Sequence, residues 1–392
     1  MDRQTDEQAA VVAFLANPAS HGLSAPVEIH ETHGSRVFLA GDRAYKLKRA
    51  VKLPYLDYSQ PAQRKAMCAR ELAANRAMAP ELYETVLGIV RDGDTLRFGD
   101  AGDERAVDWV VVMRRFGQDA LLEARRKAGR LALADMIPLA EAVAHFHLAA
   151  PASSDFGGIC GIRAVVEENV GILRDAGGAL CPAALVGEYA ALSEAWLRRL
   201  RPALGRRRRT GYVRRCHGDL HLNNVTTIAG KPVLFDAIEF DDSFAWIDVF
   251  FDLAFLLMDL DSHGLHAHAN AVLNRYLERT GDYGGLAALP LFLACRAGIR
   301  AHVALAARAA HANDGPGRNE PGKLLNAAIS YLRTRRPVLI AVGGLSGTGK
   351  TTLARLLAPE RGTAPGAVIL RSAVIRKTML GVAEDMRRGA AA

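Results

Sequence analysis

The apolar residues in the first third of the chain fall into short runs separated by turn residues, a pattern typical of neighbouring β-strands. Two longer stretches instead have apolar residues at helical spacing. This part of the chain therefore predicts a small antiparallel sheet with accompanying helices. The predicted segments are a helix over 1–20, two strands within 27–39, a strand over 43–48, a helix over 63–77, and strands over 84–90 and 107–113.

The pattern becomes mainly helical beyond Asp119. Helical spacing predicts a helix over 133–150, and further helices over 271–334 that a polar loop at 313–321 interrupts. An apolar run over 337–343, close to the end of the chain, predicts one more strand. The chain is therefore expected to form an α+β domain followed by a short α/β segment.

Two aspartates and an asparagine lie around a predicted hairpin in the middle of the chain. Asp219 belongs to the triplet His217-Gly218-Asp219, Asn224 follows it five residues later, and Asp236 follows the apolar run 233–235. Phosphoryl transfer needs a carboxylate to orient or deprotonate the attacking hydroxyl, and an amide oxygen and a second carboxylate to hold magnesium. We therefore predict Asp219 as the catalytic base, and Asn224 and Asp236 as ligands of Mg²⁺.

The predicted strand over 43–48 carries candidate phosphate-binding lysines. Kinases use a lysine of the third strand to pair the phosphates with a glutamate from a helix. Lys46 lies on the same strand face as Ala44, a small residue of the kind against which adenine packs. Lys48 shares this face and is an alternative to Lys46. Glu71, in the middle of the helix over 63–77, is the expected partner of the lysine.

The segment from Cys216 to Asn224, with the later Asp236, resembles the aminoglycoside phosphotransferase branch of the protein-kinase-like fold, which includes choline and fructosamine kinases. The run from Ile247 to Ala254 matches that family too, and the resemblance makes Asp252 a support of the catalytic loop. The resemblance covers about residues 25–310. It implies a bilobal α+β fold that uses ATP and Mg²⁺ to phosphorylate the hydroxyl group of a small molecule.

The resemblance also implies a connector, or hinge, whose backbone binds adenine. By order along the chain this hinge is Met113 to Phe116, directly after the last predicted strand of the sheet. In the expected division of the chain, residues 1–118 form an N-lobe and residues 119–334 a helical C-lobe with the catalytic loop. Residues 335–392 then form a separate nucleotide-binding part.

A complete P-loop signature, G-x-x-x-x-G-K-[ST], starts at Gly344. The glycines let successive backbone N–H groups surround phosphate oxygens, Lys350 adds a positive charge, and Thr351 can hold magnesium. A strand before the loop and a helix after it, as expected here, are the required context. The residues predicted to bind nucleotide are Gly344, Ser346, Gly347, Thr348, Gly349, Lys350, Thr351 and Thr352.

The segment after the P-loop resembles P-loop small-molecule kinases only at its front. Those kinases often have an aspartate that receives the substrate proton where this chain has Ala373, and no later strand ends in a clear acidic ligand. We therefore expect a partial α/β P-loop unit, truncated or degenerate. The whole order resembles a bacterial two-part family, in which an aminoglycoside-phosphotransferase-like domain is fused to a P-loop kinase-like domain.

Charge and cysteine usage narrow the function further. A net charge of +8 favours polyanionic ligands such as nucleotides. The arginine-rich stretch from Arg198 to Arg215 is interpreted as a solvated loop, so no specific nucleic-acid partner is expected. Five scattered cysteines favour reduced thiols in the cytoplasm. The polar start and the lack of an apolar run of about 18 residues predict no signal peptide and no membrane span.

Two functions fit these observations. The favoured one is an ATP- and Mg²⁺-dependent phosphotransferase acting on a small-molecule hydroxyl. The alternative is a nucleotide-sensing or regulatory protein whose P-loop binds ATP without turnover. The acceptor stays open, because Glu239, Asp241 and Asp242 either favour a cationic substrate or form a solvated acidic loop.

Overall fold

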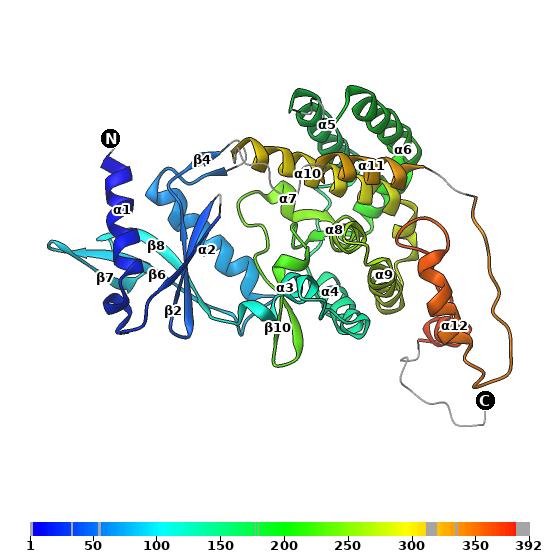
Figure 1. Cartoon of the computed structure of the whole chain (residues 1–392), viewed down its shortest axis with the longest axis horizontal. Coiled ribbons are helices and arrows are strands. Elements are labelled where there is room, and N and C mark those ends of the chain that lie inside the picture. The colour runs from blue at the N-terminus through cyan, green and yellow to red at the C-terminus, as the bar shows by residue number, and fades with distance from the viewer. Residues whose placement is uncertain are drawn as a thin grey trace. The chain divides into compact units, whose positions relative to one another are not determined.

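The computed structural model describes residues 3–32, 34–53, 56–176, 178, 180–310, 320–333 and 336–381. The chain divides into two compact units, which are described separately (Figure 1). Unit 1 combines residues 1–130 with residues 216–246, and unit 2 combines residues 131–215 with residues 247–392. The predicted catalytic loop is therefore part of the same unit as the N-terminal sheet.

Unit 1 is built on a six-stranded sheet with the order β1-β2-β3-β8-β6-β7, in which every pairing is antiparallel. Its strands are β1 Glu28–Glu31, β2 Ser35–Ala40, β3 Arg43–Lys48, β6 Tyr83–Asp92, β7 Thr95–Asp100 and β8 Ala106–Arg114. The helices beside them are α1 Arg3–Ala16, α2 Pro61–Arg76 and α3 Leu122–Lys127, with the short hairpin β4 Lys52–Leu53 and β5 Leu56–Asp57.

The two faces of the sheet bury separate apolar clusters. Successive residues of a strand point to opposite faces, so Val110 and Val112 of β8 pack in one cluster with Leu15 of α1. Val111 and Met113 pack in the other cluster, which also contains residues of α2. Because both faces are covered, β8 is almost continuously apolar.

The predicted hairpin of the catalytic segment is present in unit 1. Strands β10 Val225–Ile228 and β11 Lys231–Leu234 pair antiparallel around Ala229 and Gly230. Both turn residues have positive φ, 48° and 77°, as the tight two-residue hairpin turn requires. The short helices η4 Leu222–Asn224 and α7 Asp242–Ala245 flank the hairpin along the chain.

Unit 2 is mainly helical in the residues that the structure describes, with short strand segments at the changes between units and irregular segments near the end of the chain. Its helices are α4 Met136–Ala149, α5 Gly158–Ala176, α6 Ala183–Arg209, α8 Val249–Ser262, α9 His266–Thr280, α10 Leu289–Ala310, α11 Glu320–Leu332, α12 Lys350–Leu357 and α13 Ser372–Met379. The strand segments are β9 Val213–Arg215 and β12 Trp246–Asp248. Among these described helices, none combines the length and apolar character that a membrane span needs.

Buried polar contacts fix the helices of unit 2. His147 of α4 lies 3.0 Å from Asp252 of α8 and 2.9 Å from the hydroxyl of Tyr276. Asp252 is fully buried. The guanidinium of Arg207 donates to Asp248 and to Asp282 over distances of 2.7 to 2.9 Å. The interpretation of the arginine-rich stretch as a loop is therefore wrong, because its residues up to Arg209 belong to α6 and Arg207 is buried there.

The strand predicted over 337–343 is wrong. This segment has no regular secondary structure, and Figure 1 draws it as an extended trace before α12. Its apolar side chains are largely exposed, for example Val338 at 80% and Leu339 at 90%. A strand needs a neighbour for its N–H and C=O groups, and no described strand pairs with this segment. The expected α/β P-loop unit thus has its helix but lacks its sheet within residues 336–381.

Residues 365–371 instead lie along α9. Asn270 donates to the carbonyls of Pro365 and Ala367 at 3.1 and 3.0 Å. Asn274, one turn further on, donates to Ala367 O at 3.2 Å and accepts from Ile369 N at 2.7 Å. These residues face the segment together because positions four apart share one side of a helix. Side-chain amides of α9 therefore bond the main-chain groups of this segment, which no strand pairs within the described residues.

Most element predictions of the first 300 residues are confirmed within a few residues, and the strand over 43–48 coincides with β3. Strand β7 was not predicted. It is half-exposed and polar at alternate positions, so it lacks the apolar run used to recognise its neighbours. The loop at 313–321 lies almost wholly outside the described residues, and the three-part domain division stays a prediction.

Candidate active site

A cavity of about 480 Å³ opens in unit 1, which is within the usual size range of small-molecule sites. Strands β2 and β3, the connector after β8, and the segment from 219 to 240 supply its walls. The lining residues on which the argument depends are Val37, Leu39, Ala44, Lys46, Lys48, Tyr58, Met113, Phe116, Asp219, Asn224, Asp236 and Glu239.

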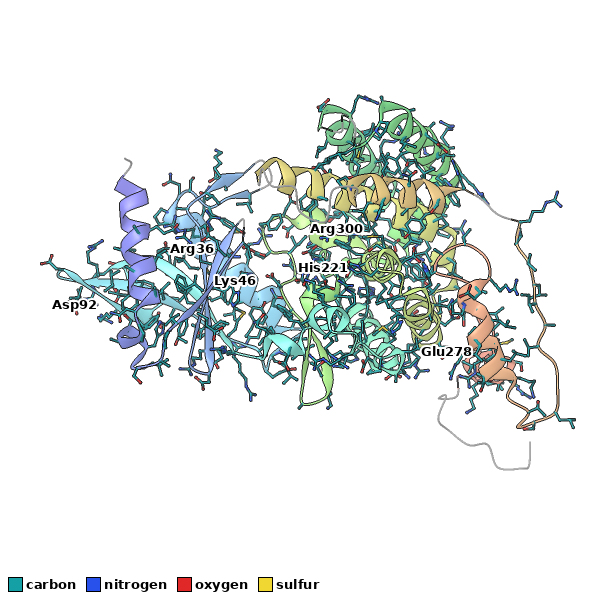
Figure 2. All side chains as sticks on the ribbon, viewed as in Figure 1. Arg36, Lys46, Asp92, His221, Glu278 and Arg300 are labelled. Carbon is teal, nitrogen blue, oxygen red and sulfur yellow. The ribbon has the colours of Figure 1, made fainter. Side chains whose placement is uncertain are left out.

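Lys46 of β3, labelled in Figure 2, contacts two carboxylates at the cavity wall. Its Nζ lies 2.8 Å from Glu71 Oε1 of α2 and 2.5 Å from Asp236 Oδ1. Burial alone would lower the pKa of Lys46, but the negative charges of Asp236 and Glu71 outweigh it and raise the pKa well above its ordinary value. Lys46 is therefore a fixed positive charge beside the candidate metal ligand.

Lys48 makes a separate buried contact set. Its ammonium pairs with Glu71 Oε2 and with Glu239 Oε1, and only 2% of its side chain is exposed. The hydroxyl of Tyr58 donates to the same oxygen of Glu239 at 2.9 Å. The sequence left Lys46 and Lys48 as alternatives for the phosphate-binding lysine. Lys46 is the one that contacts Asp236, whereas Lys48 contacts Glu239, three residues further along the chain.

Glu71 joins the two lysines because each of its oxygens contacts one ammonium. The side chain of Glu71 is completely buried. Burial would raise its pKa, but the charges of Lys46 and Lys48 dominate and lower the pKa to about 2. Glu71 is therefore a carboxylate at neutral pH, and it sets the position of both lysines.

Asp219 lies on the predicted catalytic loop, where neighbouring side chains orient it. Asn224 Nδ2 donates to Asp219 Oδ2 at 3.0 Å and to its backbone oxygen at 2.9 Å. His221 Nε2 lies 3.3 Å from the same carboxylate oxygen. The Asp219 side chain is 39% exposed, so a substrate hydroxyl can approach its carboxylate.

His217 holds the loop to the segment that follows the hairpin. Its Nε2 lies 2.8 Å from the carbonyl of Phe235, and its own carbonyl accepts from Ile238 N at 2.9 Å. The next residue, Gly218, has a φ of 82°, and a Cβ there would lie only 2.8 Å from Phe244 O. A glycine is required because both the backbone conformation and the close approach disfavour a side chain.

The conformation of Asp236 is also unusual. Its φ of 63° lies in the left-handed region, which non-glycine residues seldom adopt. Its backbone N–H donates to the hydroxyl of Tyr83 at 3.1 Å. The next residue, Ala237, is held by Asn75 of α2, which accepts from its N–H at 2.8 Å and donates to its carbonyl at 3.4 Å. These contacts keep the Asp236 side chain pointed at Lys46.

The donor set fits a hard cation such as Mg²⁺, which prefers oxygen ligands. The Asp236 carboxylate is 42% exposed, and one of its oxygens contacts Lys46. The amide nitrogen of Asn224 is directed at Asp219, which turns the amide oxygen the opposite way. Asn224 and Asp236 are therefore the residues that would hold the ion.

The other end of the cavity is apolar. Ala44 of β3 is paired across the sheet with Met113 of β8, and both side chains line the cavity. Phe116, in the connector after β8, packs edge-on against Phe235 with 5.3 Å between ring centroids. A small residue beside a methionine and an aromatic pair leaves room for a planar ring between apolar walls.

The acidic residues after Asp236 are all engaged within unit 1. Glu239 is paired with Lys48. Asp241 accepts from Ser243 N at the start of α7, and Asp242 lies 2.6 Å from the guanidinium of Arg70. These contacts give each of the three carboxylates a structural role. They therefore support neither of the two interpretations left open by the sequence, a cationic substrate and a solvated acidic loop.

The P-loop residues form a turn ahead of α12 in unit 2. Gly344, Gly347 and Gly349 have φ values of 149°, 82° and 82°. Lys350 Nζ and Thr348 Oγ1 donate to Leu345 O at 2.5 and 2.8 Å. Residues 344–349 are exposed, as is Thr352, whereas Lys350 and Thr351 are half-buried. The P-loop sequence is thus followed by helix α12 and forms a turn around the carbonyl of Leu345. Within the described residues it lacks the sheet that normally supports such a loop.

Several residues of the site were not predicted from the sequence. Asn75 lies one helical turn beyond Glu71, and that spacing could have placed it on the same helix face. Tyr58, Tyr83 and His221 carry no comparable signal. The strand alternation placed Lys48 on the correct face, but its partner Glu239 is far away in sequence.

Curated proteins from two mycobacteria are similar to the chain in sequence. No protein-family model matches it. It is 29% identical over 336 residues to an uncharacterized protein of Mycobacterium tuberculosis and to one of Mycobacterium bovis, a match covering 84% of this chain. The match covers 64% of the relatives, so the chain spans less than two thirds of the length of the curated proteins it matches.

Solved structures that are similar to the chain have low sequence identity. A choline/ethanolamine kinase family protein from Mesorhizobium loti is 17% identical, with a TM-score of 0.48, and the match covers 84% of this chain and 95% of that one. An aminoglycoside phosphotransferase is 14% identical with a TM-score of 0.49, and the match covers 83% and 99%. A choline kinase from Cryptosporidium parvum is 10% identical with a TM-score of 0.46, covering 83% and 94%.

Proposed function

We propose that the chain is an ATP- and Mg²⁺-dependent phosphotransferase whose acceptor is the hydroxyl group of a small molecule. One observation carries this proposal. Lys46 lies between Glu71 and Asp236 at the wall of a cavity in unit 1, and the Asp219–Asn224 pair lines the same cavity. A lysine, a metal-binding carboxylate, a metal-binding amide and a second carboxylate are the set that phosphoryl transfer requires.

Each residue has one task in this proposal. Asp219 accepts a hydrogen bond from the acceptor hydroxyl and orients it towards the γ-phosphate. It takes the hydroxyl proton as the new O–P bond forms and the bond between the γ-phosphorus and ADP breaks, with ADP as the leaving group. Lys46 binds the phosphates, and Glu71 keeps its ammonium in place. Asn224 and Asp236 would hold Mg²⁺, which would neutralise the phosphate charge when bound. Ala44 and the hinge from Met113 to Phe116 bind adenine.

The test compares Asp219→Ala with Asp236→Ala. ATP consumption is measured with a panel of hydroxyl-bearing metabolites, and ADP binding is measured by calorimetry. Loss of the base should abolish consumption and spare Mg²⁺-dependent ADP binding, whereas loss of the metal ligand should weaken both. Normal ATP consumption in both variants would contradict the proposal.

A second nucleotide site at the P-loop is favoured by the complete Gly344–Thr351 signature at the start of α12. In that site the backbone N–H groups and Lys350 would bind phosphate, and Thr351 would contribute to binding Mg²⁺. The chain would then bind ATP there without turnover, as a sensing or regulatory protein does. Calorimetry on Lys46→Ala and Lys350→Ala separates the two sites, and two binding events in the parent protein are expected.

Cellular location and partners follow as part of the same proposal. Free thiols and nucleotide use suit the cytoplasm. Nucleotides and a small-molecule acceptor are the expected partners, and no specific nucleic acid is among them.

A further inference from the structure

The segment 236–239 is tied to the rest of unit 1 at both ends. Asn75 bonds both backbone groups of Ala237, at 2.8 and 3.4 Å. Glu239 accepts from Lys48 and from the Tyr58 hydroxyl. Asn75 is completely buried and Glu239 is 5% exposed, so water competes little for these bonds.

Helix α2 connects these two anchors to the catalytic lysine. Glu71 and Asn75 are one turn apart on α2, and Asn75 Nδ2 also donates to Glu71 O at 3.0 Å. Glu71 contacts Lys46 with one oxygen and Lys48 with the other. The position of the segment after Asp236 and the position of Lys46 therefore depend on the same helix face.

Asp236 needs such support because its backbone is in the left-handed region, at a φ of 63°. A non-glycine residue keeps such a conformation only where the surrounding structure determines it.

Lys48 is too buried to reach a phosphate in the cavity directly, since its ammonium is engaged by Glu71 and Glu239.

We propose that Asn75, Lys48 and Glu239 are positioning residues, which hold the Asp236 carboxylate in its metal-binding place before nucleotide and Mg²⁺ arrive. This inference rests on the proposed function, since it assigns Asp236 to the metal. It predicts that the segment 236–239 is ordered without ligand. It also predicts that losing either anchor reduces the factor by which Mg²⁺ strengthens nucleotide binding more than it reduces nucleotide affinity without the metal.

The first test is ADP binding in a Lys350→Ala background, which leaves one nucleotide site. Calorimetry in excess Mg²⁺ and in EDTA gives the factor by which the metal strengthens binding. In Glu239→Ala and in Asn75→Ala this factor should fall about 10- to 100-fold, the usual effect of losing a residue that orients a metal ligand. Affinity in EDTA should change much less, because Lys46 and the hinge are intact.

Glu239→Gln is the matched control, because its amide oxygen can still accept from Lys48 and Tyr58. It should retain most of the Mg²⁺ factor that Glu239→Ala loses. An unchanged Mg²⁺ factor in folded Glu239→Ala and Asn75→Ala would overturn the inference. Failure of Asp236→Asn to alter the factor would overturn the proposed function instead.

A second measurement needs no variant. Hydrogen exchange of residues 236–240 is followed in the full-length protein alone and with Mg²⁺ and ADP. The Ala237 amide should be protected in both conditions, since its partner is Asn75. Rapid exchange that becomes slow only with Mg²⁺ and ADP would show that the ligand, rather than the anchors, orders the segment, and would overturn the inference.

Discussion

Lys46 of β3 and Glu71 of α2 form a buried ion pair with 2.8 Å between Nζ and Oε1. The pair joins the sheet of unit 1 to the helix that carries Asn75, and its lysine also contacts Asp236. The same helix therefore controls the lysine and the chain segment that presents the candidate metal ligand.

The two neighbouring lysines should respond differently to substitution. Lys46→Met should weaken ADP binding and reduce phosphoryl transfer about 100-fold, because a phosphate contact present in the transition state is lost. Lys48→Met should destabilise the fold by about 3–5 kcal/mol, because Glu239 is then buried without its cation. It should also lower the factor by which Mg²⁺ strengthens ADP binding, while affinity in EDTA stays close to that of the parent protein. Calorimetry and thermal unfolding separate the two effects. The opposite pattern would make Lys48 the phosphate lysine.

The pKa of Glu71 gives a pH dependence of stability. It is lowered from 4.5 to about 2 in the folded protein, so the native state binds this proton more weakly than the unfolded state does. The stabilisation is present above pH 4.5 and is lost as the pH falls towards 2. The difference in unfolding free energy between the parent protein and Glu71→Gln should be constant near neutral pH and shrink below pH 4.5. A constant difference down to the acid limit of folding would contradict this.

Gly218→Ala should damage the catalytic loop. The added Cβ meets Phe244 O at 2.8 Å and Ile238 Cδ1 at 3.0 Å, in a backbone conformation with a φ of 82°. Gly230→Ala in the hairpin turn is the matched control, since its φ is 77° and a Cβ there has nothing within 4 Å. Each variant carries about 1–2 kcal/mol of backbone strain, and only Gly218→Ala should lose more and lose activity. Equal unfolding free energies would show that the loop relaxes around the methyl group.

Ala44→Leu should fill the apolar end of the cavity. The larger side chain would lie beside Met113 in the volume assigned to adenine, so ADP affinity should fall by about tenfold or more while the fold is retained. The measurement is calorimetry in the Lys350→Ala background, with circular dichroism to verify folding. Unchanged affinity would place adenine elsewhere.

Asn274→Ala should release the C-terminal segment from α9, because Asn274 bonds both Ala367 O and Ile369 N. Limited trypsin digestion should then cleave at Arg361 and Arg371 much faster than in the parent protein. Asn326→Ala is the matched control, because this exposed asparagine donates to Gly322 O of its own helix, α11, at 2.8 Å. Equal cleavage in both variants would show that other contacts hold the segment.

The sequence predicted the elements with local signals better than the contacts between distant residues. Strand β3 could be predicted because turn residues mark its boundary, and Ala44 indicated which strand face carries Lys46. The apolar run at 337–343 looked like a strand, but a strand also requires a partner, which the run cannot encode by itself. Tyr58 bonds the side chain of Glu239 and Asn75 bonds the main chain of Ala237, 181 and 162 residues away in the sequence, so no local pattern could have identified these partners.

The amides of α9 recognise the main chain of residues 365–369 rather than its side chains. Carbonyl and N–H groups are the same in nearly every residue type, so this part of the chain is free to change its side chains during evolution while its attachment persists. Selection should therefore act on Asn270 and Asn274 more strongly than on the residues they hold.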